Sequence, residues 1–584
     1  MTENNKTPPK DMLDWFCLTD ASRWRLVRPL GAGIAVMLAF LVMLALLAGA
    51  AILGRAILDQ DGTAQNAGIV IAAIIAAPYL LWSMSIRHKL FGFQKEGQIT
   101  DRILNALEQL GTEKTLRTTA TDAQGNPQRI EKTVPNIEIR IGGLLALERI
   151  AQDSARYDRG RDHVRVLEIL CAYIRQNAPA STARDFPLPD WPALPEDPTD
   201  EARQVHEMWR QARFADPHNS NARDWARSLP VPRVDIQMAL NIVTQRSPAQ
   251  RRAEADWGDD ASEPASWVFD SEALPQLPAN VEQEGLSAEE CKAFQQRLTG
   301  WREVIWAYGG YRLDLSNTNL QGANLSAALL CGARMEGARM EGANLAEARL
   351  EGARLSNARI TGANLFAARL QGARLLEAKM EGVYLRRARL EGALLTEARL
   401  EGALLYRARL EGADLRGARL EGADFGEARM EGVNLTRARM DGASLFGAQL
   451  EWANLFESNL QRASLFETQL KGADLRGARM EGAYVIRTRM DADTALSAAS
   501  MIGAAIKEVD FADVRISSEQ LLSTFGDTTV TMPRSAGHDL LNRPGHWPKW
   551  ALPVAVSDGN DFPTQWNIWQ NRPQTYTPPP PPGT

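Results

Sequence analysis

Arginine and glutamate recur at fixed spacing through the second half of the chain, where they are the side chains best able to do chemistry. From residue 339 to residue 439 every tenth position is arginine or lysine, and an acid follows two positions later in nine of the eleven cases. Guanidinium and carboxylate groups at such spacing pair with one another or with a charged partner, which is binding chemistry rather than catalysis. The residues that we take as candidate interaction rows are Arg349, Arg369, Arg389, Arg409, Arg429, Glu351, Glu391, Glu411 and Glu431.

Common active-site and metal-site spacings are absent from the sequence. It contains no P-loop, no G-x-S-x-G, no H-E-x-x-H and no dinucleotide-binding glycine motif followed by an acid. The four cysteines (Cys17, Cys171, Cys291 and Cys331) lie at least 40 positions apart, and the six histidines have no metal-ligand spacing. We therefore predict reduced thiols, and no catalytic, metal-binding or cofactor-binding residues.

The elements that carry the charged rows follow a period of five residues. From Leu315 to Met490 an apolar residue occupies every position divisible by five, and leucine fills 26 of the 36 positions. Two residues earlier stands a small residue, which is alanine in 29 cases. A helix repeats at 3.6 residues and a strand at 2, so a strict five fits neither. The pattern predicts a solenoid in which each pentapeptide forms one short extended face and a corner.

This unit resembles the A-[DN]-L-x-x motif of the pentapeptide-repeat family, as in Ala413-Asp414-Leu415, Ala323-Asn324-Leu325 and Ala473-Asp474-Leu475. The resemblance implies a mainly β fold, a right-handed quadrilateral parallel β-helix. At four faces per coil and about 4.8 Å per stacked strand, residues 311–490 would form about nine coils, roughly 43 Å long. None of the 30 prolines falls between 311 and 490, as expected because proline would remove hydrogen bonds between coils.

With twenty residues per coil, the arginine and glutamate positions fall on two opposite faces. Each face should carry an arginine row beside a glutamate row, and we expect interleaved ion pairs because the opposite charges offset repulsion within each row. Two interpretations stay open. The rows are either a patterned binding surface or the mixed charge that keeps a solvated rod soluble.

The charge balance bears on nucleic-acid partners. Residues 311–490 hold 26 Lys and Arg against 22 Asp and Glu, or +4, so the rest of the chain carries -10 of the total -6. Some pentapeptide-repeat proteins protect DNA gyrase by presenting an acidic rod that imitates duplex DNA, and a +4 rod disfavours that role. Because acids neighbour the arginines, we expect no nucleic-acid partner either.

Residues 30–86 contain two uncharged apolar stretches, at about 31–54 and 67–86, each long enough to cross a bilayer core of about 30 Å as a helix. Basic residues flank the outer ends of this pair, whereas the connector has only Arg55. The positive-inside rule then places both termini in the cytoplasm. We expect a multi-pass protein of the bacterial inner membrane, with residues 1–29 and the β-helix cytoplasmic. A cleaved signal peptide or a buried helical pair fits the length and composition poorly.

Residues 96–180 show apolar residues at helical spacing in three stretches, 98–110, 139–151 and 163–175. Gly142-Gly143 and Asn177-Ala178-Pro179 make this segment similar to the membrane-proximal part of many bacterial pentapeptide-repeat membrane proteins. The resemblance implies a small HEAT-like helical module. It is either a docking module or a spacer that packs against the start of the rod.

Residues 181–310 are predicted to be a proline-rich and acidic linker with short helices. Residues 253–291 hold eleven acids and no Lys or Arg, which indicates a flexible acidic loop. A helix at 234–245 is expected, and another at 292–308 is expected to cap the N-terminal end of the rod.

Residues 491–584 are predicted to be a capping helix at 492–509 followed by a proline-rich tail. A short helix at 518–525 lies between them, and the five prolines from Pro578 to Pro582 indicate an extended end.

Together these features predict a non-catalytic, membrane-tethered protein whose rod is a scaffold or interaction surface for an unidentified protein partner. Two alternatives belong to other classes. One is a regulator of a DNA-associated enzyme that acts by DNA mimicry, and the other is an enzyme with its site in residues 96–310.

Overall fold

The computed structural model describes residues 98–121, 127–157, 160–186, 221–257, 266–278, 286–534, 543–554 and 560–581, and the isolated positions 51, 199, 201–202, 204–205 and 208. The chain divides into two compact units, residues 1–102 and 103–584. The predicted segment at 1–29 and the predicted hairpin at 30–86, apart from Ala51, lie outside the described residues. Among the described helices, none has both the length and the apolar character needed to span a membrane.

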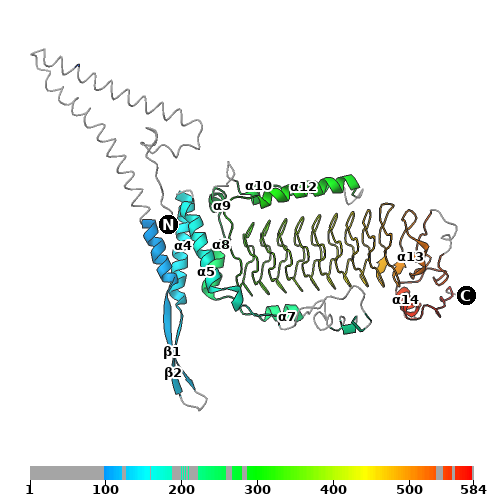
Figure 1. Ribbon diagram of the computed structural model, residues 1–584, viewed down its shortest axis with the longest axis horizontal. Helices are drawn as coiled ribbons and strands as arrows, with labels where there is room; N and C mark the ends of the chain where they lie inside the picture. The colour runs from blue at the N-terminus through cyan, green and yellow to red at the C-terminus, as the bar shows by residue number, and fades with distance from the viewer. Residues whose placement is uncertain are drawn as a thin grey trace, which may run out of the picture. The chain divides into compact units, whose positions relative to one another are not determined.

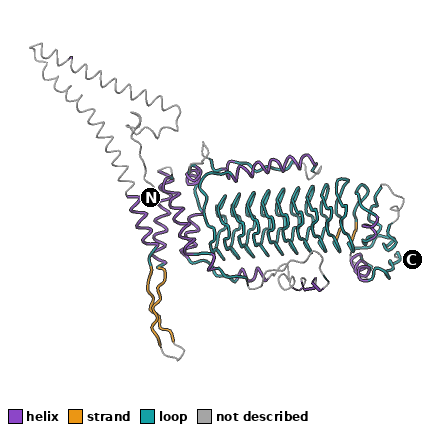
Figure 2. The backbone as a smooth tube through the Cα atoms, in the orientation of Figure 1, coloured by secondary structure: helices purple, strands orange, loops and turns teal. Residues whose placement is uncertain are grey.

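The second unit is built around a parallel β-helix (Figures 1 and 2). Each pentapeptide gives one short bridge and one two-residue corner, and the bridges join positions twenty residues apart, such as Arg369 with Arg389. The small residue and the leucine or methionine of each unit point inward, so that Ala408 and Leu410 are fully buried. Alanine keeps the coil narrow enough for one larger side chain per face. The predicted period and the predicted β-helix are confirmed.

The rod extends past its predicted end at 490, and the predicted helix at 492–509 is wrong. Bridges join Asp474 to Ala495 and Asp510 to Thr531, while β3 (Tyr484–Ile486) pairs in parallel with β4 (Ala505–Lys507). The step from Asp474 to Ala495 is 21 residues instead of 20, because one residue is inserted. This insertion moves the inward apolar positions off the multiples of five. They continue as Leu496, Met501, Ile506, Phe511 and Leu521.

Four helices close the N-terminal end of the rod. They are α4 (Ile137–Tyr157), α5 (Arg161–Asn177), α8 (Val234–Thr244) and α9 (Pro248–Ala255), and they pack on one another. The Ala180 N–H donates to the Asn317 carbonyl (2.8 Å), and the Leu329 N–H donates to the Thr244 carbonyl (3.0 Å). These bonds satisfy backbone groups of the first coil that have no preceding coil to pair with. The helical module packs against the start of the rod, as one of its two interpretations predicted, and the other interpretation, a docking module, stays a prediction.

A buried polar network ties this module together. Glu254 of α9 accepts from Arg246 (2.5 Å), and its other carboxylate oxygen lies 3.0 Å from His163 Nε2. All three side chains are almost fully buried. The Glu254 carbonyl also accepts from the Tyr311 N–H (2.8 Å), which links the network to the first residues of the rod.

Several described elements were not predicted at their positions, among them a hairpin and the helices α9 and α10. An antiparallel hairpin, β1 (Glu113–Thr121) and β2 (Pro127–Pro135), precedes α4 and pairs Glu113 with Pro135. Helix α9 begins at a capping box formed by Ser247 and Gln250, inside a stretch that composition alone assigned to linker and loop. The short α10 (Val268–Ser271) also lies within the predicted acidic loop.

Two helices lie along the sides of the rod. Helix α12 (Ala288–Trp306) confirms the predicted helix at 292–308, but it runs beside the coils and does not cap their end (Figure 1). Helix α7 (Asn221–Arg227) lies against a second edge, and the 3-10 turn η2 (Ala180–Thr182) leads from α5 to the first coil.

The C-terminal end is closed by α13 (Ser518–Leu522), which confirms the predicted short helix, and by α14 (Phe562–Asn571). Phe525, Trp566 and Trp569 form a buried cluster there. Trp550 Nε1 donates to the Pro579 carbonyl (3.1 Å), so the described part of the proline-rich tail packs back on the protein.

Candidate interaction surface

The predicted rows form a ladder of shared ion pairs. Arg409 Nε lies 3.0 Å from an oxygen of Glu391 and 3.2 Å from one of Glu411, which belongs to its own coil. Arg429 bridges Glu411 (3.2 Å) and Glu431 (3.3 Å) in the same way. At the start of the row Glu351 contacts both Arg349 and Arg369, and Arg389 contacts Glu391. The predicted interleaved ion pairs are confirmed.

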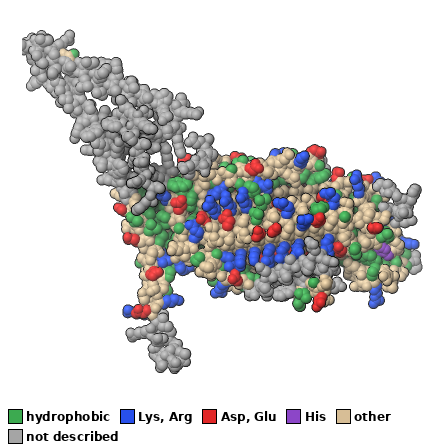
Figure 3. All heavy atoms as spheres, in the orientation of Figure 1, with side chains coloured by type: hydrophobic (Ala, Val, Ile, Leu, Met, Phe, Trp, Pro, Cys, Tyr) green, Lys and Arg blue, Asp and Glu red, His purple; other side chains and the backbone are tan. Residues whose placement is uncertain are grey.

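A second ladder follows the opposite edge. Arg399 lies 2.9 Å from Glu381 and 3.5 Å from Glu401, and Arg419 lies 2.9 Å from Glu401. Rows of Lys and Arg side chains are visible along the rod in Figure 3.

The glutamates of both ladders are buried, whereas both interpretations left open for the rows, a binding surface and a solvated rod, place them on an exposed face. Glu391, Glu411 and Glu431 are each 1% exposed. Burial and the adjacent carboxylates raise the pKa of Glu411 to about 7, and burial raises the pKa of Glu431 to about 7. In the second ladder burial and the neighbouring Glu381 and Glu421 raise the pKa of Glu401 to about 8. Only the arginines of the candidate rows stay accessible, with side chains 20 to 43% exposed.

The burial comes from segments of the same chain that cover the two glutamate edges. Along one edge Gln295 and Trp306 of α12 donate to the carbonyls of Gly432 (3.0 Å) and Gly372 (2.8 Å). On the other edge Arg223 of α7 donates to the carbonyls of Gly382 (3.0 Å) and Gly402 (2.8 Å). These two edges are therefore engaged within the chain.

Aromatic and arginine side chains follow a third edge. Phe446 stacks on Phe466, with ring centroids 5.6 Å apart and ring planes 16° apart. Arg386 lies over the rings of Tyr384 (5.9 Å) and Tyr406 (5.0 Å). We call this set the aromatic row, and its members are Phe366, Tyr384, Arg386, Tyr406, Arg407, Phe446, Phe466, Tyr484 and Arg487.

The aromatic row is accessible along much of its length. Phe446 is 40% exposed, and Arg386, Arg407 and Arg487 are exposed as well. At the C-terminal end of the row Tyr484 packs edge-on against Trp566 of α14 (4.6 Å). The signal in the sequence was the recurrence of aromatic residues at intervals close to twenty or forty residues, which the stronger leucine period obscures.

The repeats of the rod match a known family of proteins. Residues 311–346, 343–382, 384–422, 413–448 and 443–482 match the family described as pentapeptide repeats, in eight copies. No curated protein matches the chain. Among solved structures, HetL, a pentapeptide repeat protein involved in heterocyst differentiation regulation from the cyanobacterium Nostoc sp. strain PCC 7120, is 32% identical, with a TM-score of 0.29. That match covers 33% of this chain and 87% of HetL.

Two further solved structures are similar. QnrB1, a plasmid-mediated fluoroquinolone resistance protein, is 16% identical over 34% of this chain and 82% of its own, with a TM-score of 0.22. A pentapeptide repeat protein from the thylakoid lumen of Arabidopsis thaliana is 28% identical over 18% of this chain and 74% of its own, with a TM-score of 0.14.

Proposed function

Because the chain belongs to the pentapeptide-repeat family, we propose that it is a non-catalytic interaction protein whose rod binds a protein partner through the aromatic row. We further propose that residues 30–86 tether the rod to the bacterial inner membrane, with both termini and the rod in the cytoplasm. The support for the tether is the pair of apolar stretches and the basic residues that flank them.

The observation that carries the proposal is the combination of side chains in the aromatic row. Tyrosine and arginine are enriched among the residues that dominate binding energy at protein interfaces. Arg386 and Arg387 are exposed and make no ion pair with any described residue, whereas Arg407 is paired with Glu427 (2.6 Å). A complementary partner surface would present carboxylates beside apolar groups.

DNA mimicry receives no support from the geometry of the ladders. A mimic needs exposed negative charge in regular rows. Here the glutamates of both ladders are buried and the arginines of the first ladder are accessible. The rod therefore does not present its rows of glutamates at the surface.

An enzyme site in residues 96–310 receives no support from the described part of that segment. His163 and Glu254 lie together there, but both are buried, and Glu254 pairs with both His163 and Arg246. These groups are engaged in closing the rod and have no access to a substrate.

The test is quantitative proximity labelling from the C-terminus of the full-length protein in intact cells. Replacing Arg386 and Tyr406 by alanine should remove the partner that the wild-type protein labels. The matched control replaces Phe456 and Arg476, which form the same type of cation–π contact (5.7 Å) elsewhere on the rod. An unchanged partner set in the first variant would reject the aromatic row, and a periplasmic C-terminal reporter would reject the proposed topology.

A further inference from the structure

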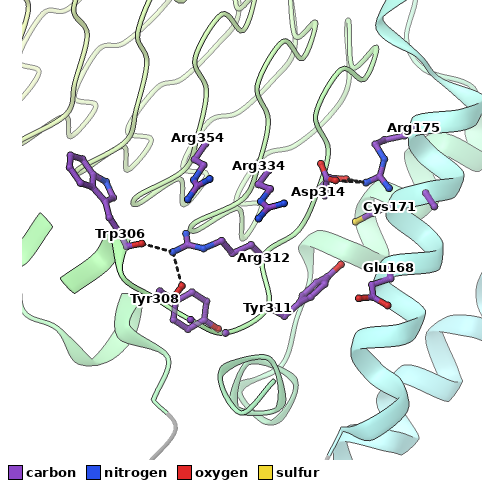
Figure 4. A pocket seen from close by; sticks show the side chains of 13 residues that line it. Glu168, Cys171, Arg175, Trp306, Tyr308, Tyr311, Arg312, Asp314, Arg334 and Arg354 are labelled. Carbon is purple, nitrogen blue, oxygen red and sulfur yellow. Dashed lines mark hydrogen bonds and ion pairs between the residues drawn. The ribbon is translucent and has the colours of Figure 1, made fainter. Parts of the chain in front are cut away.

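A cavity of about 710 Å³ lies where α5 meets the first coils of the rod (Figure 4). Its walls come from α5, from the segment that joins α12 to the rod, and from successive coils. The charged groups that line it are Arg175, Arg312, Arg334, Arg354, Glu168 and Asp314. Four cations face two acids, so the lining carries a net positive charge.

Arg334 and Arg354 belong to one row of the β-helix. Parallel bridges run from Asp314 to Arg334, then to Arg354 and Arg374, with one residue from each coil. Successive coils stack about 4.8 Å apart, so these side chains start from backbone positions separated by that distance. Arg374 leaves the cavity and lies over the ring of Trp306 (4.1 Å).

These arginines differ from those of the two ladders. In the ladders the guanidinium groups contact buried glutamates, as Arg409 contacts Glu391 and Glu411. Arg334 and Arg354 form no side-chain hydrogen bond and no ion pair with any described residue. Asp314, the nearest acid in the row, is already paired with Arg175 (3.1 Å). Two stacked cations without a compensating acid repel each other, and an anion between them would remove that repulsion.

Arg312 adds a third cation that is fixed in place. Its guanidinium donates to the carbonyls of Trp306 (3.1 Å), Tyr308 (2.9 Å) and Gly332 (3.2 Å), which are neutral acceptors. Burial, and then the positive charge of Arg354, lower the pKa of Arg312 to about 10. The site therefore holds positive charge in a partly desolvated position, and Glu168 is the one lining acid that remains to offset it, because Asp314 is paired with Arg175.

The other lining groups do not supply a reaction. Burial raises the pKa of Cys171 to about 11, so its thiol stays protonated at neutral pH. Tyr308 and Tyr311 contribute aromatic walls, and burial raises the pKa of both phenols. These features favour binding over covalent chemistry.

We propose that this cavity binds a small soluble polyanion that carries at least two phosphate groups, held by the guanidinium groups of Arg312, Arg334 and Arg354. Arginine binds phosphate through two parallel hydrogen bonds, and a stacked pair of arginines suits two linked phosphates. The proposal goes beyond the interaction function of the rod, because it concerns a different face and a different class of ligand.

The test is calorimetric titration of the full-length protein, purified in a mild detergent, with inorganic pyrophosphate. We expect saturable binding that weakens about tenfold or more in the Arg334→Gln/Arg354→Gln variant. The matched control is Arg416→Gln, an exposed arginine remote from the cavity that is paired with Asp414. Equal affinity in wild type and double variant, or no saturable binding to the wild type, would overturn the proposal.

A second measurement separates binding from a folding defect. Pyrophosphate should raise the thermal unfolding midpoint of the wild type and of Arg416→Gln, and leave that of the double variant unchanged. Without ligand the double variant should unfold at the same or a higher temperature, because a repulsive pair has been removed. Short-chain phosphatidic acid is titrated in parallel, and binding of this lipid without binding of pyrophosphate would overturn the assignment to a soluble ligand.

Discussion

The side chain of Leu298 on α12 occupies the space that a β-carbon on Gly412 would need. A Cβ atom built on Gly412 would lie 2.7 Å from Leu298 Cδ2, closer than two carbon atoms approach in folded proteins. Gly412 has a φ of +63°, but positive φ alone does not require glycine in this rod. Glu397 and Arg407 hold a φ of 58° and 56° at other edges. Glycine recurs on the α12 edge because the helix packs directly on the corners.

Replacing Gly412 by alanine should therefore destabilise the rod more than the backbone conformation alone predicts. We expect a loss of about 2–4 kcal/mol, of which about 1 comes from positive φ and the rest from the clash with Leu298. The measurement is the free energy of unfolding by urea.

The control for that variant is Gly417→Ala. Gly417 has nearly the same φ, +64°, but its added Cβ would meet only Glu397 Cγ at 3.5 Å, an ordinary contact. Its loss should be about 1 kcal/mol. Equal losses at the two positions would show that helix packing does not select the glycines.

The stability of the rod should fall as pH rises from about 5 to about 8. The pKa of Glu401 is raised from its ordinary value of 4.5 to about 8, so the folded protein keeps a proton that the unfolded chain releases. This contribution is complete below pH 4.5 and is lost as pH rises through 8. Within that window each such proton changes the free energy of unfolding by about 1.4 kcal/mol per pH unit.

Glu401→Gln should flatten this dependence, because glutamine keeps the shape of the carboxyl group but has no proton to lose. Unfolding by urea at pH 5, 6, 7 and 8 gives the slope directly. Glu397→Gln changes an exposed glutamate in the same coil and should leave the slope as it is. A wild-type slope of zero would show that Glu401 is ionised in the folded protein throughout this range.

Removing one arginine from a ladder should lower the free energy of unfolding more at high pH than at low pH. Arg409 contacts both Glu391 and Glu411, so Arg409→Met leaves two buried carboxylates with less compensation. We expect a loss of about 3–5 kcal/mol at pH 8. At pH 5 the loss should be smaller, because the carboxyl group of Glu411, whose pKa burial and the adjacent carboxylates raise to about 7, is protonated and neutral there.

Arg416→Met is the matched change at the surface. Arg416 pairs with Asp414 at 2.7 Å, but its side chain is 56% exposed, and such pairs contribute about 1 kcal/mol or less. The loss of unfolding free energy in Arg416→Met should not depend on pH between 5 and 8. A pH-independent loss for Arg409→Met as well would show that the ladder glutamates do not change protonation when their partner is removed.

The inward-facing positions of the rod were predictable from the sequence, because residues such as Ala408 and Leu410 must face inward wherever the period of five holds. The sequence also predicted the pairing of Arg409 with its neighbours, because the spacing of twenty brings these charges together. The burial of Glu411 was not predictable in this way. It depends on α12, whose contact residue Leu298 is 114 positions from Gly412, and a local pattern carries no information about such a contact.

The predicted end of the rod was wrong because the period of five is interrupted there. One inserted residue moves Leu496 off the multiples of five, and an alanine-rich stretch then has the composition of a helix. The aromatic row and the cavity arginines were missed for another reason. Tyr384 and Arg334 stand at positions that vary from coil to coil, so their alignment appears only once the coils are stacked.

Replacing Glu254 should make the N-terminal end of the rod unfold locally more readily than the other coils. Glu254 contacts His163 and Arg246 through its side chain and Tyr311 through its carbonyl, so Glu254→Ala leaves the Arg246 guanidinium buried without its acid. We expect a loss of about 3–5 kcal/mol in the stability of this end. Because each coil of a solenoid contacts only its neighbours, hydrogen exchange should quicken in peptides covering 311–335 and change little in those covering 500–531. The control is Glu303→Ala, at an exposed position of α12, which should leave hydrogen exchange in both regions unchanged. If exchange instead quickens uniformly along the rod in Glu254→Ala, the coils and the helical module unfold as one cooperative unit.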